Sequence, residues 1–184
     1  MTWVDAIPIV LVLVYAALGY YTGVMRRLIG LVSLYLACVG ATNMGLSAGG
    51  ILQQSSSYGT ADARILGFFG ILFAIIIVID GAAQLANSQI QMQAIVFNRL
   101  SGVIIGVVTA LLLSVLVTYE LQAAGNPFGG TTLDSLQQSV RDGVNGSHVA
   151  VPLVRAFGKP VISLFQPVLP ADPQIYFGPG PVNP

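Results

Sequence analysis

The chain has 184 residues, of which 55% are hydrophobic and only 8% are charged. Soluble globular domains carry about 25% charged residues, and a chain with so few could not cover its surface and stay monomeric in water. Seven basic and seven acidic residues cancel, which excludes the basic field that nucleic-acid binding needs, and the mean hydropathy of +0.82 indicates an integral membrane protein.

Four apolar segments follow one another, each close to the ~20 residues that a bilayer-crossing helix requires. They cover residues 3–20, 24–44, 65–86 and 101–123. A tight turn around Gly23 separates the first two segments, which predicts an antiparallel helical hairpin. The first segment begins with Asp5 and no basic residue, unlike a cleaved signal peptide. We therefore expect an all-α domain of four transmembrane helices over residues 1–124.

Two polar stretches connect the later segments. Residues 47–64 predict a loop rich in Ser, Gly and Gln. Residues 87–100 predict a helical extension or a short interfacial helix. The apolar residues of this second stretch recur near helical spacing, at Ile90, Ala94, Ile95 and Phe97.

Residues 125–184 form a tail of different composition. Thr132 is the expected N-cap of an amphipathic helix whose apolar stripe is Leu133, Leu136, Val140 and Val144. Residues 149–169 are apolar but are interrupted by three prolines, which favours a surface-lying or re-entrant segment over a fifth span. The end is proline-rich and is expected to be extended. Its Tyr176–Phe177 pair is a candidate for docking on a partner or on lipid headgroups.

Basic residues set the expected orientation, because cytoplasmic loops carry an excess of Lys and Arg. In a four-span chain Arg26, Arg27 and Arg99 share one side. Arg64 lies in the short loop on the other side. We predict that the three arginines face the cytoplasm and that both termini are extracytoplasmic.

Asp80 closes the apolar run of the third segment. A carboxylate at the bilayer centre costs roughly 2.5 to 3.5 kcal/mol, but this residue lies about 24 Å along its helix, near an interface. We expect it to pair with the arginines of that side, while the acids Asp5 and Glu120 lie near Arg64 at the opposite rim. The candidate interfacial ion pairs therefore involve Asp80, Arg26, Arg27, Arg99, Asp5, Arg64 and Glu120. The alternative role for Asp80 is a proton or ion relay.

Small residues recur at a spacing of four, which lets helix backbones approach closely in lipid. The fourth segment carries an unbroken row of such residues, and a shorter row occupies the second segment at Ser33, Ala37 and Ala41. The candidate helix-packing residues are Gly19, Gly23, Gly102, Gly106, Ala110 and Ser114.

The sequence carries no recognisable catalytic, cofactor or metal motif. His148 is the one histidine and lies in the tail, so it is expected to be an exposed polar residue. Cys38 is the one cysteine and lies inside an apolar run, where it is expected to pack as a small residue. We therefore expect no enzyme activity, no cofactor and no metal.

Short motifs follow a recognisable order. Asp5 precedes the first apolar run, GYYTG spans residues 19–23, NRLSGVIIG spans 98–106, and SHVAVPLV spans 147–154. In this order, over roughly residues 2–170, the chain resembles the colicin V production protein family of bacterial inner-membrane proteins. The resemblance implies four spans, periplasmic termini, and a part in colicin V secretion and envelope homeostasis. One departure is that Tyr21 and Thr22 occupy a turn where the family usually carries basic residues.

The expected function is that of a non-enzymatic membrane scaffold or accessory subunit that acts through helix packing and tail contacts. Its expected partners are the lipid bilayer, further copies of the chain or other membrane subunits, and no nucleic acid. Two alternatives stay open. One is a small transporter or proton-conducting subunit centred on Asp80, and the other is an accessory subunit of a larger energy-transducing complex.

Overall fold

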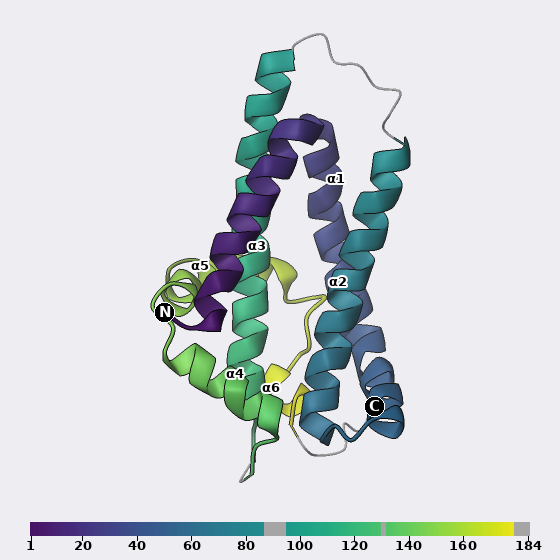
Figure 1. Ribbon diagram of the computed structural model, residues 1–184, viewed down its shortest axis with the longest axis vertical. Coiled ribbons are helices and arrows are strands. Elements are labelled where there is room, and N and C mark those ends of the chain that lie inside the picture. Colours follow the sequence, from purple (N-terminus) through teal and green to yellow (C-terminus); the bar gives the residue numbers. More distant parts are fainter. Residues whose placement is uncertain (87–94, 130–131, 179–184) are drawn as a thin grey trace.

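The computed structural model describes residues 1–86, 95–129 and 132–178. Within these ranges every regular element is an α-helix, so the predicted all-α fold is confirmed. The elements are α1 (Trp3–Ser55), α2 (Thr60–Ala86), α3 (Ile95–Gly125), α4 (Ser135–Asn145), α5 (Ala150–Phe165) and α6 (Pro173–Tyr176). The three longest helices form an upright bundle, and the three short ones gather around its lower part (Figure 1).

α1 folds back on itself at Gly23, where φ is 76° and ψ is −179°. An L side chain rarely adopts this conformation, so the glycine is required for the turn. The first arm of α1 (residues 3–22) and the second arm (residues 24–55) run in opposite directions in Figure 1. The predicted helical hairpin is therefore confirmed. We call the end of the bundle at Gly23 the hairpin end, and the end that carries α4 and α6 the tail end.

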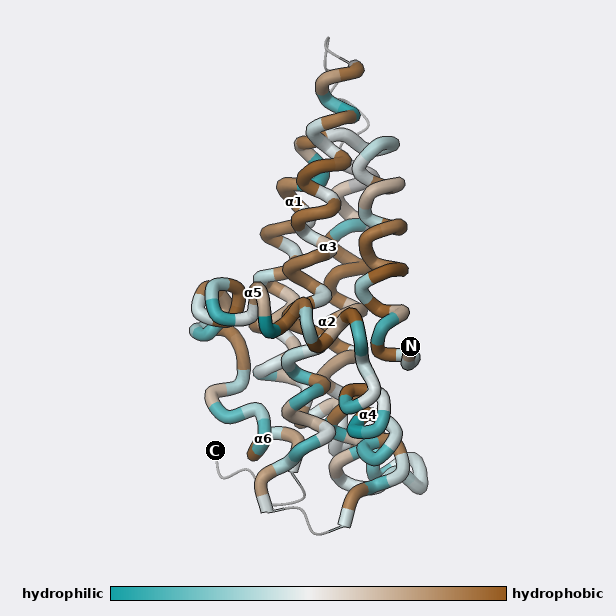
Figure 2. The backbone as a smooth tube through the Cα atoms, turned by 90° about the vertical axis from the view of Figure 1, so that its left-hand side faces the viewer, coloured by the Kyte–Doolittle hydropathy of each residue, from teal (hydrophilic) through white to brown (hydrophobic). Residues whose placement is uncertain are grey.

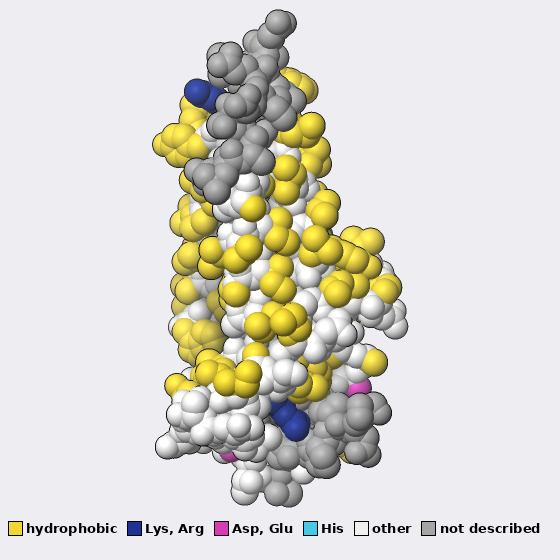
Figure 3. All heavy atoms as spheres, turned by 90° about the vertical axis from the view of Figure 1, so that its right-hand side faces the viewer, with side chains coloured by type: hydrophobic (Ala, Val, Ile, Leu, Met, Phe, Trp, Pro, Cys, Tyr) yellow, Lys and Arg dark blue, Asp and Glu magenta, His cyan; other side chains and the backbone are white. Residues whose placement is uncertain are grey.

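Apolar side chains cover the outside of the bundle. Figures 2 and 3 show that they extend from the hairpin end down to the level of α5, below which polar residues prevail. Leu13, Val32 and Ile77 are each at least 60% exposed. Three helices, α1, α2 and α3, are long and apolar enough to cross a bilayer, and each arm of α1 reaches about 30 Å or more. These exposed apolar faces identify a membrane protein whose helices are surrounded by lipid.

The expected loop over residues 47–64 is mostly helical, which corrects the sequence prediction. α1 continues to Ser55 and α2 begins at Thr60. The polar composition was misleading because this part of α1 lies beyond the apolar belt, where a helix can carry Ser and Gln on its exposed side. The Gln53 side chain, for example, donates a hydrogen bond to the Thr60 hydroxyl at 2.9 Å. Of the expected segment 87–100, residues 87–94 lie outside the described residues, and Ile95 onward extends α3.

The tail folds as helices that wrap the lower part of α3. α4 begins at Ser135 with Asp134 as its N-cap, so Thr132 is not the cap that the sequence predicted. Val140 and Val144 of the predicted apolar stripe are buried. α5 meets α4 at 87° and is seen nearly end-on in Figure 1, so it lies across the bundle axis. The segment interrupted by prolines forms one helix: Pro152 falls in its first turn, Pro160 lies inside it and Pro167 lies beyond its end.

Candidate functional site

Asp5 is buried at the tail end and fixes the start of α5. Its carboxylate accepts a hydrogen bond from the Ser147 hydroxyl at 2.5 Å and from the backbone N–H groups of His148 (3.1 Å), Val149 (2.9 Å) and Ala150 (3.3 Å). The N-terminus of a helix carries unpaired N–H groups and partial positive charge, which a carboxylate neutralises. Asp5 therefore binds peptide N–H groups, whereas the sequence analysis placed it near Arg64. This contact ties the first arm of α1 to the tail.

Asp62 and Asp134 cap each other's helices. Asp62, at the start of α2, accepts hydrogen bonds from the backbone N–H groups of Leu136 (3.0 Å) and Gln137 (2.9 Å) in the first turn of α4. Asp134, the N-cap of α4, accepts hydrogen bonds from the N–H groups of Ala61 (3.0 Å) and Asp62 (3.4 Å). Sequence reasoning missed this pair. An acid at each helix start was a visible signal, but the juxtaposition of the two starts depends on the tertiary fold.

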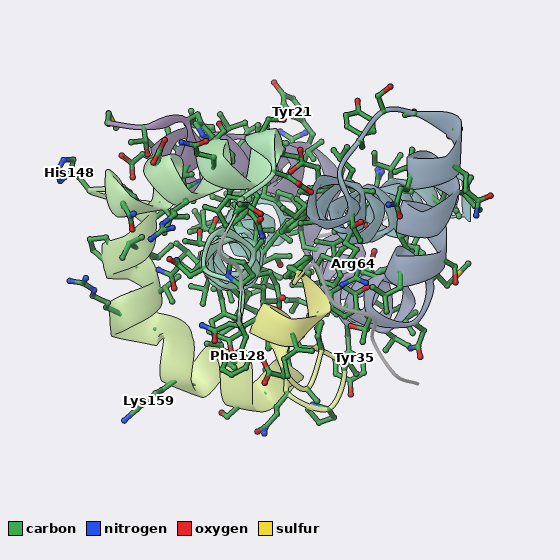
Figure 4. The ribbon with its side chains drawn as sticks, turned by 90° about the horizontal axis from the view of Figure 1, so that it is seen from below. Tyr21, Tyr35, Arg64, Phe128, His148 and Lys159 are labelled. Atoms are coloured by element: carbon green, nitrogen blue, oxygen red, sulfur yellow. The ribbon has the colours of Figure 1, made fainter. Side chains whose placement is uncertain are left out.

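Arg64 and two aromatic residues dock the end of the tail. The Arg64 guanidinium donates to the backbone carbonyls of Tyr176 and Gly178, and Figure 4 shows Arg64 beside α6. The Tyr176 hydroxyl donates to the Ala41 carbonyl at 3.1 Å, and burial raises the pKa of this phenol. The Tyr176 and Phe177 rings both pack against Phe68, with centroid separations of 5.7 and 5.5 Å. The pair is therefore buried inside the chain, which corrects the expectation that it docks on a partner or on headgroups.

Glu120 is buried in the core near the tail end. It is 1% exposed, and neither carboxylate oxygen accepts a hydrogen bond from the described part of the chain. It lines a small internal cavity together with Cys38, Phe68 and Leu169. The sequence placed Glu120 at a rim because it follows the last apolar run of α3. That reasoning missed the cover that the tail provides over this part of α3.

The hairpin end brings Arg26, Arg27 and Asp80 together. Arg26 donates to the Asp80 backbone carbonyl at 3.2 Å. Arg27 is 2% exposed, its Nε donates to the Thr22 hydroxyl at 3.2 Å, and its guanidinium lies 5.5 Å from the centre of the Tyr15 ring. These contacts hold α2 and the turn of α1 in register.

Two further contacts complete the hairpin end. Arg99 lies over the Tyr20 ring at 5.3 Å. The Asn98 side chain accepts a hydrogen bond from the N–H of Val24 at 2.9 Å. Asn98 therefore satisfies a backbone group that the turn at Gly23 leaves without a helical partner, and both contacts join α3 to α1.

Glycines set the distance between the first arm of α1 and α3. A Cβ atom added to Gly19 would lie 3.0 Å from the Val103 Cα, and one added to Gly102 would lie 2.8 Å from the Gly23 carbonyl carbon. A Cβ on Gly106 would lie 3.1 Å from the carbonyl carbon of Tyr15. Ala110 and Ser114, which continue the row along α3, are fully buried. The six candidate packing residues therefore lie in or beside buried helix contacts.

A second glycine contact joins the second arm of α1 to α2. A Cβ on Gly67 would lie 2.5 Å from the Gly49 nitrogen, and one on Gly45 would lie 3.0 Å from the Phe68 Cα. Sequence reasoning missed this contact because it ended the second span at residue 44. The signal was present, since the row of small residues in that span continues at a spacing of four to Gly45 and Gly49.

Three carboxylates, Asp5, Asp62 and Asp134, thus clamp the tail helices to the membrane bundle, and arginines secure both ends. Within the described ranges, no group of three or more His, Cys, Asp or Glu residues is placed to hold a metal ion.

The Colicin V production protein family model matches residues 4–141. The chain belongs to this family. The match covers α1, α2 and α3 and ends within α4, so α5 and α6 lie beyond the matched residues. No curated protein and no solved structure matches the chain significantly.

Proposed function

We propose that this Colicin V production family member is a non-enzymatic scaffold or accessory subunit of the bacterial inner membrane, with a part in envelope homeostasis or secretion. The observation that supports the proposal is that the buried polar groups bind backbone groups of the same chain. Asp5, Asp62 and Asp134 all bind helix N-termini, and Arg64 binds tail carbonyls. These groups hold the fold together, which suits a protein that presents surfaces to others.

The proposed orientation places the hairpin end in the cytoplasm and both termini outside. Arg26, Arg27 and Arg99 lie at the hairpin end, and cytoplasmic loops are enriched in such residues. The tail helices then form a layer on the extracytoplasmic surface.

The outer face of α2 is the surface that we propose for contact with another membrane helix. Gly70, Ala74 and Gly81 fall within about 40° of one another around the helix axis, and all three are exposed. A Cβ atom added to Gly70 or Gly81 would meet nothing within 4 Å. Small residues on a lipid-facing helix allow a second helix to pack closely, so this face suits a second copy of the chain or another subunit.

The test is the mass of the protein extracted in a mild detergent, measured for the wild type and for Gly70→Leu. We expect the wild type to run as an assembly larger than the 19.2 kDa chain, and Gly70→Leu to shift it toward the monomer. Ala17→Leu is the matched control because Ala17 is exposed on the first arm of α1, away from the α2 face. A wild-type monomer without associated subunits would contradict the proposal.

The second candidate is a small transporter or proton-conducting subunit centred on Asp80. Its support is the position of Asp80 on α2, partly buried, with Arg26 bound to its backbone carbonyl and with one carboxylate oxygen 3.7 Å from where a Cβ on Gly30 would lie. Proton flux into liposomes, compared between the wild type and Asp80→Asn, separates the two candidates. Equal flux in both, at the level of empty liposomes, leaves the scaffold as the function.

A further inference from the structure

A groove runs along α5 at the tail end of the bundle. It consists of two adjoining cavities of about 740 and 710 Å³, which share Tyr119, Gln122, Arg155 and Ala171 in their walls. α3 forms one wall, α5 forms the other, and the segment that leads into α6 closes one side. The α5 wall and the segment that leads into α6 lie beyond the residues that match the family, whereas the α3 wall lies within them.

α5 has the faces of a helix that lies in a membrane surface. Gly158, Val161 and Phe165 are buried against the bundle. Phe157 and Leu164 are 53% and 62% exposed. Arg155 lies on the groove side of α5, and the two apolar residues lie about half a turn around the helix from it.

The depth of α5 agrees with such a position. It lies across the bundle axis at the lower limit of the apolar belt (Figures 1 and 2). Its exposed apolar side chains can therefore enter lipid while its basic side stays at the level of the headgroups.

The groove offers free positive charge. Arg155 and Lys159 follow each other by one helical turn and line the groove, and Figure 4 shows Lys159 extending from α5 at the edge of the molecule. Neither side chain is hydrogen-bonded or ion-paired within the described part of the chain. Asp172 is the acidic side chain among the lining residues, and it is already engaged, since it accepts a hydrogen bond from the N–H of Ile175 at 3.3 Å.

We propose that this groove binds the phosphate headgroup of an anionic phospholipid. Arginine forms paired, charge-assisted hydrogen bonds to phosphate oxygens, and a basic side chain at the membrane surface adds attraction to anionic lipid. Arg155 lines both cavities and is the primary contact, while Lys159 supports it from the rim. The lipid's acyl chains then run along the apolar side of α5, beside Phe157 and Leu164.

The test is a titration of the full-length protein in mild detergent with phosphatidylglycerol and with phosphatidylcholine, in which native mass spectrometry counts the bound lipids. We expect the wild type to retain phosphatidylglycerol in preference to phosphatidylcholine. Each lost charge should weaken phosphatidylglycerol binding about fivefold, and the double variant Arg155→Gln/Lys159→Gln about 30-fold. Arg141→Gln is the matched control, because Arg141 is exposed on α4 and lines neither cavity.

Equal phosphatidylglycerol binding by the double variant and the Arg141→Gln control would overturn the proposal. So would displacement of the lipid by an equal concentration of inorganic phosphate, because the groove would then be a site for a free anion. Arg155→Lys keeps the charge but not the paired hydrogen bonds, so it should bind phosphatidylglycerol more tightly than Arg155→Gln and less tightly than the wild type. The proposal goes beyond the scaffold function. The two are tested separately, because the lipid titration does not depend on the mass measured for the Gly70→Leu variant.

Discussion

Replacing Asp62 by alanine should release α4 from the bundle. The change removes two backbone hydrogen bonds to the first turn of α4 and the acceptor of the Ser135 hydroxyl at 3.2 Å. Loss of a helix cap costs about 1 kcal/mol, and leaving the buried N–H of Gln137 without a partner adds about 1 to 3 kcal/mol. The docked state of α4 should therefore lose about 2 to 4 kcal/mol, which is about a 30- to 900-fold rise in the population of the undocked state.

Hydrogen–deuterium exchange of the amides in α4, measured on the full chain in mild detergent, checks this value. Asp142→Ala is the control, because it removes the same charge from an exposed position on the same helix. Asp62→Asn keeps one acceptor oxygen and should show an intermediate effect. If Asp62→Ala and Asp142→Ala speed the exchange of α4 equally, the cap does not hold the helix and the reasoning is refuted.

Three further substitutions test other contacts through the thermal unfolding of the purified protein. Gly102→Ala should lose about 1 to 3 kcal/mol of stability because its Cβ would meet the backbone of the hairpin turn, whereas Gly70→Ala, which meets nothing, should not. Glu120→Leu should keep or gain stability, by up to about 3 kcal/mol, because it removes a buried carboxylate that accepts no hydrogen bond from the described residues. A clear loss of stability would mean that the carboxylate has a hydrogen-bond partner. Tyr176→Phe should cost about 1 kcal/mol by removing the hydrogen bond to Ala41, and an unchanged midpoint would contradict that bond.

The helices of the membrane bundle could be predicted from the sequence because they depend on the apolar residues of each segment itself. A helix in lipid must satisfy its own backbone, so the apolar segments had to be helices, and Gly23 marked the turn between two of them. The small-residue rows indicated where backbones could approach. The extent of the second arm was misjudged because residues 47–55 look like a loop once they leave the apolar belt.

The structure of the tail was harder to predict because it depends on contacts between residues that are far apart in the sequence. Asp5 is 142 residues from Ser147, and Asp62 is 75 residues from Gln137. Nothing in the composition says that these carboxylates cap distant helices. For the same reason Tyr176 and Glu120 were misplaced, one expected on a partner and the other at a rim.

The claim on which the account depends is that lipid surrounds the bundle while the connection between α4 and α5, at His148, stays in water. In a chain with Cys38 replaced by alanine, single cysteines at Ile77, His148 and Arg99 should be probed in intact spheroplasts with a membrane-impermeant maleimide. The account predicts labelling at position 148, labelling at position 99 only after permeabilisation, and none at position 77 until the protein is denatured. Labelling of position 77 in the native membrane at the rate of position 148 would contradict it.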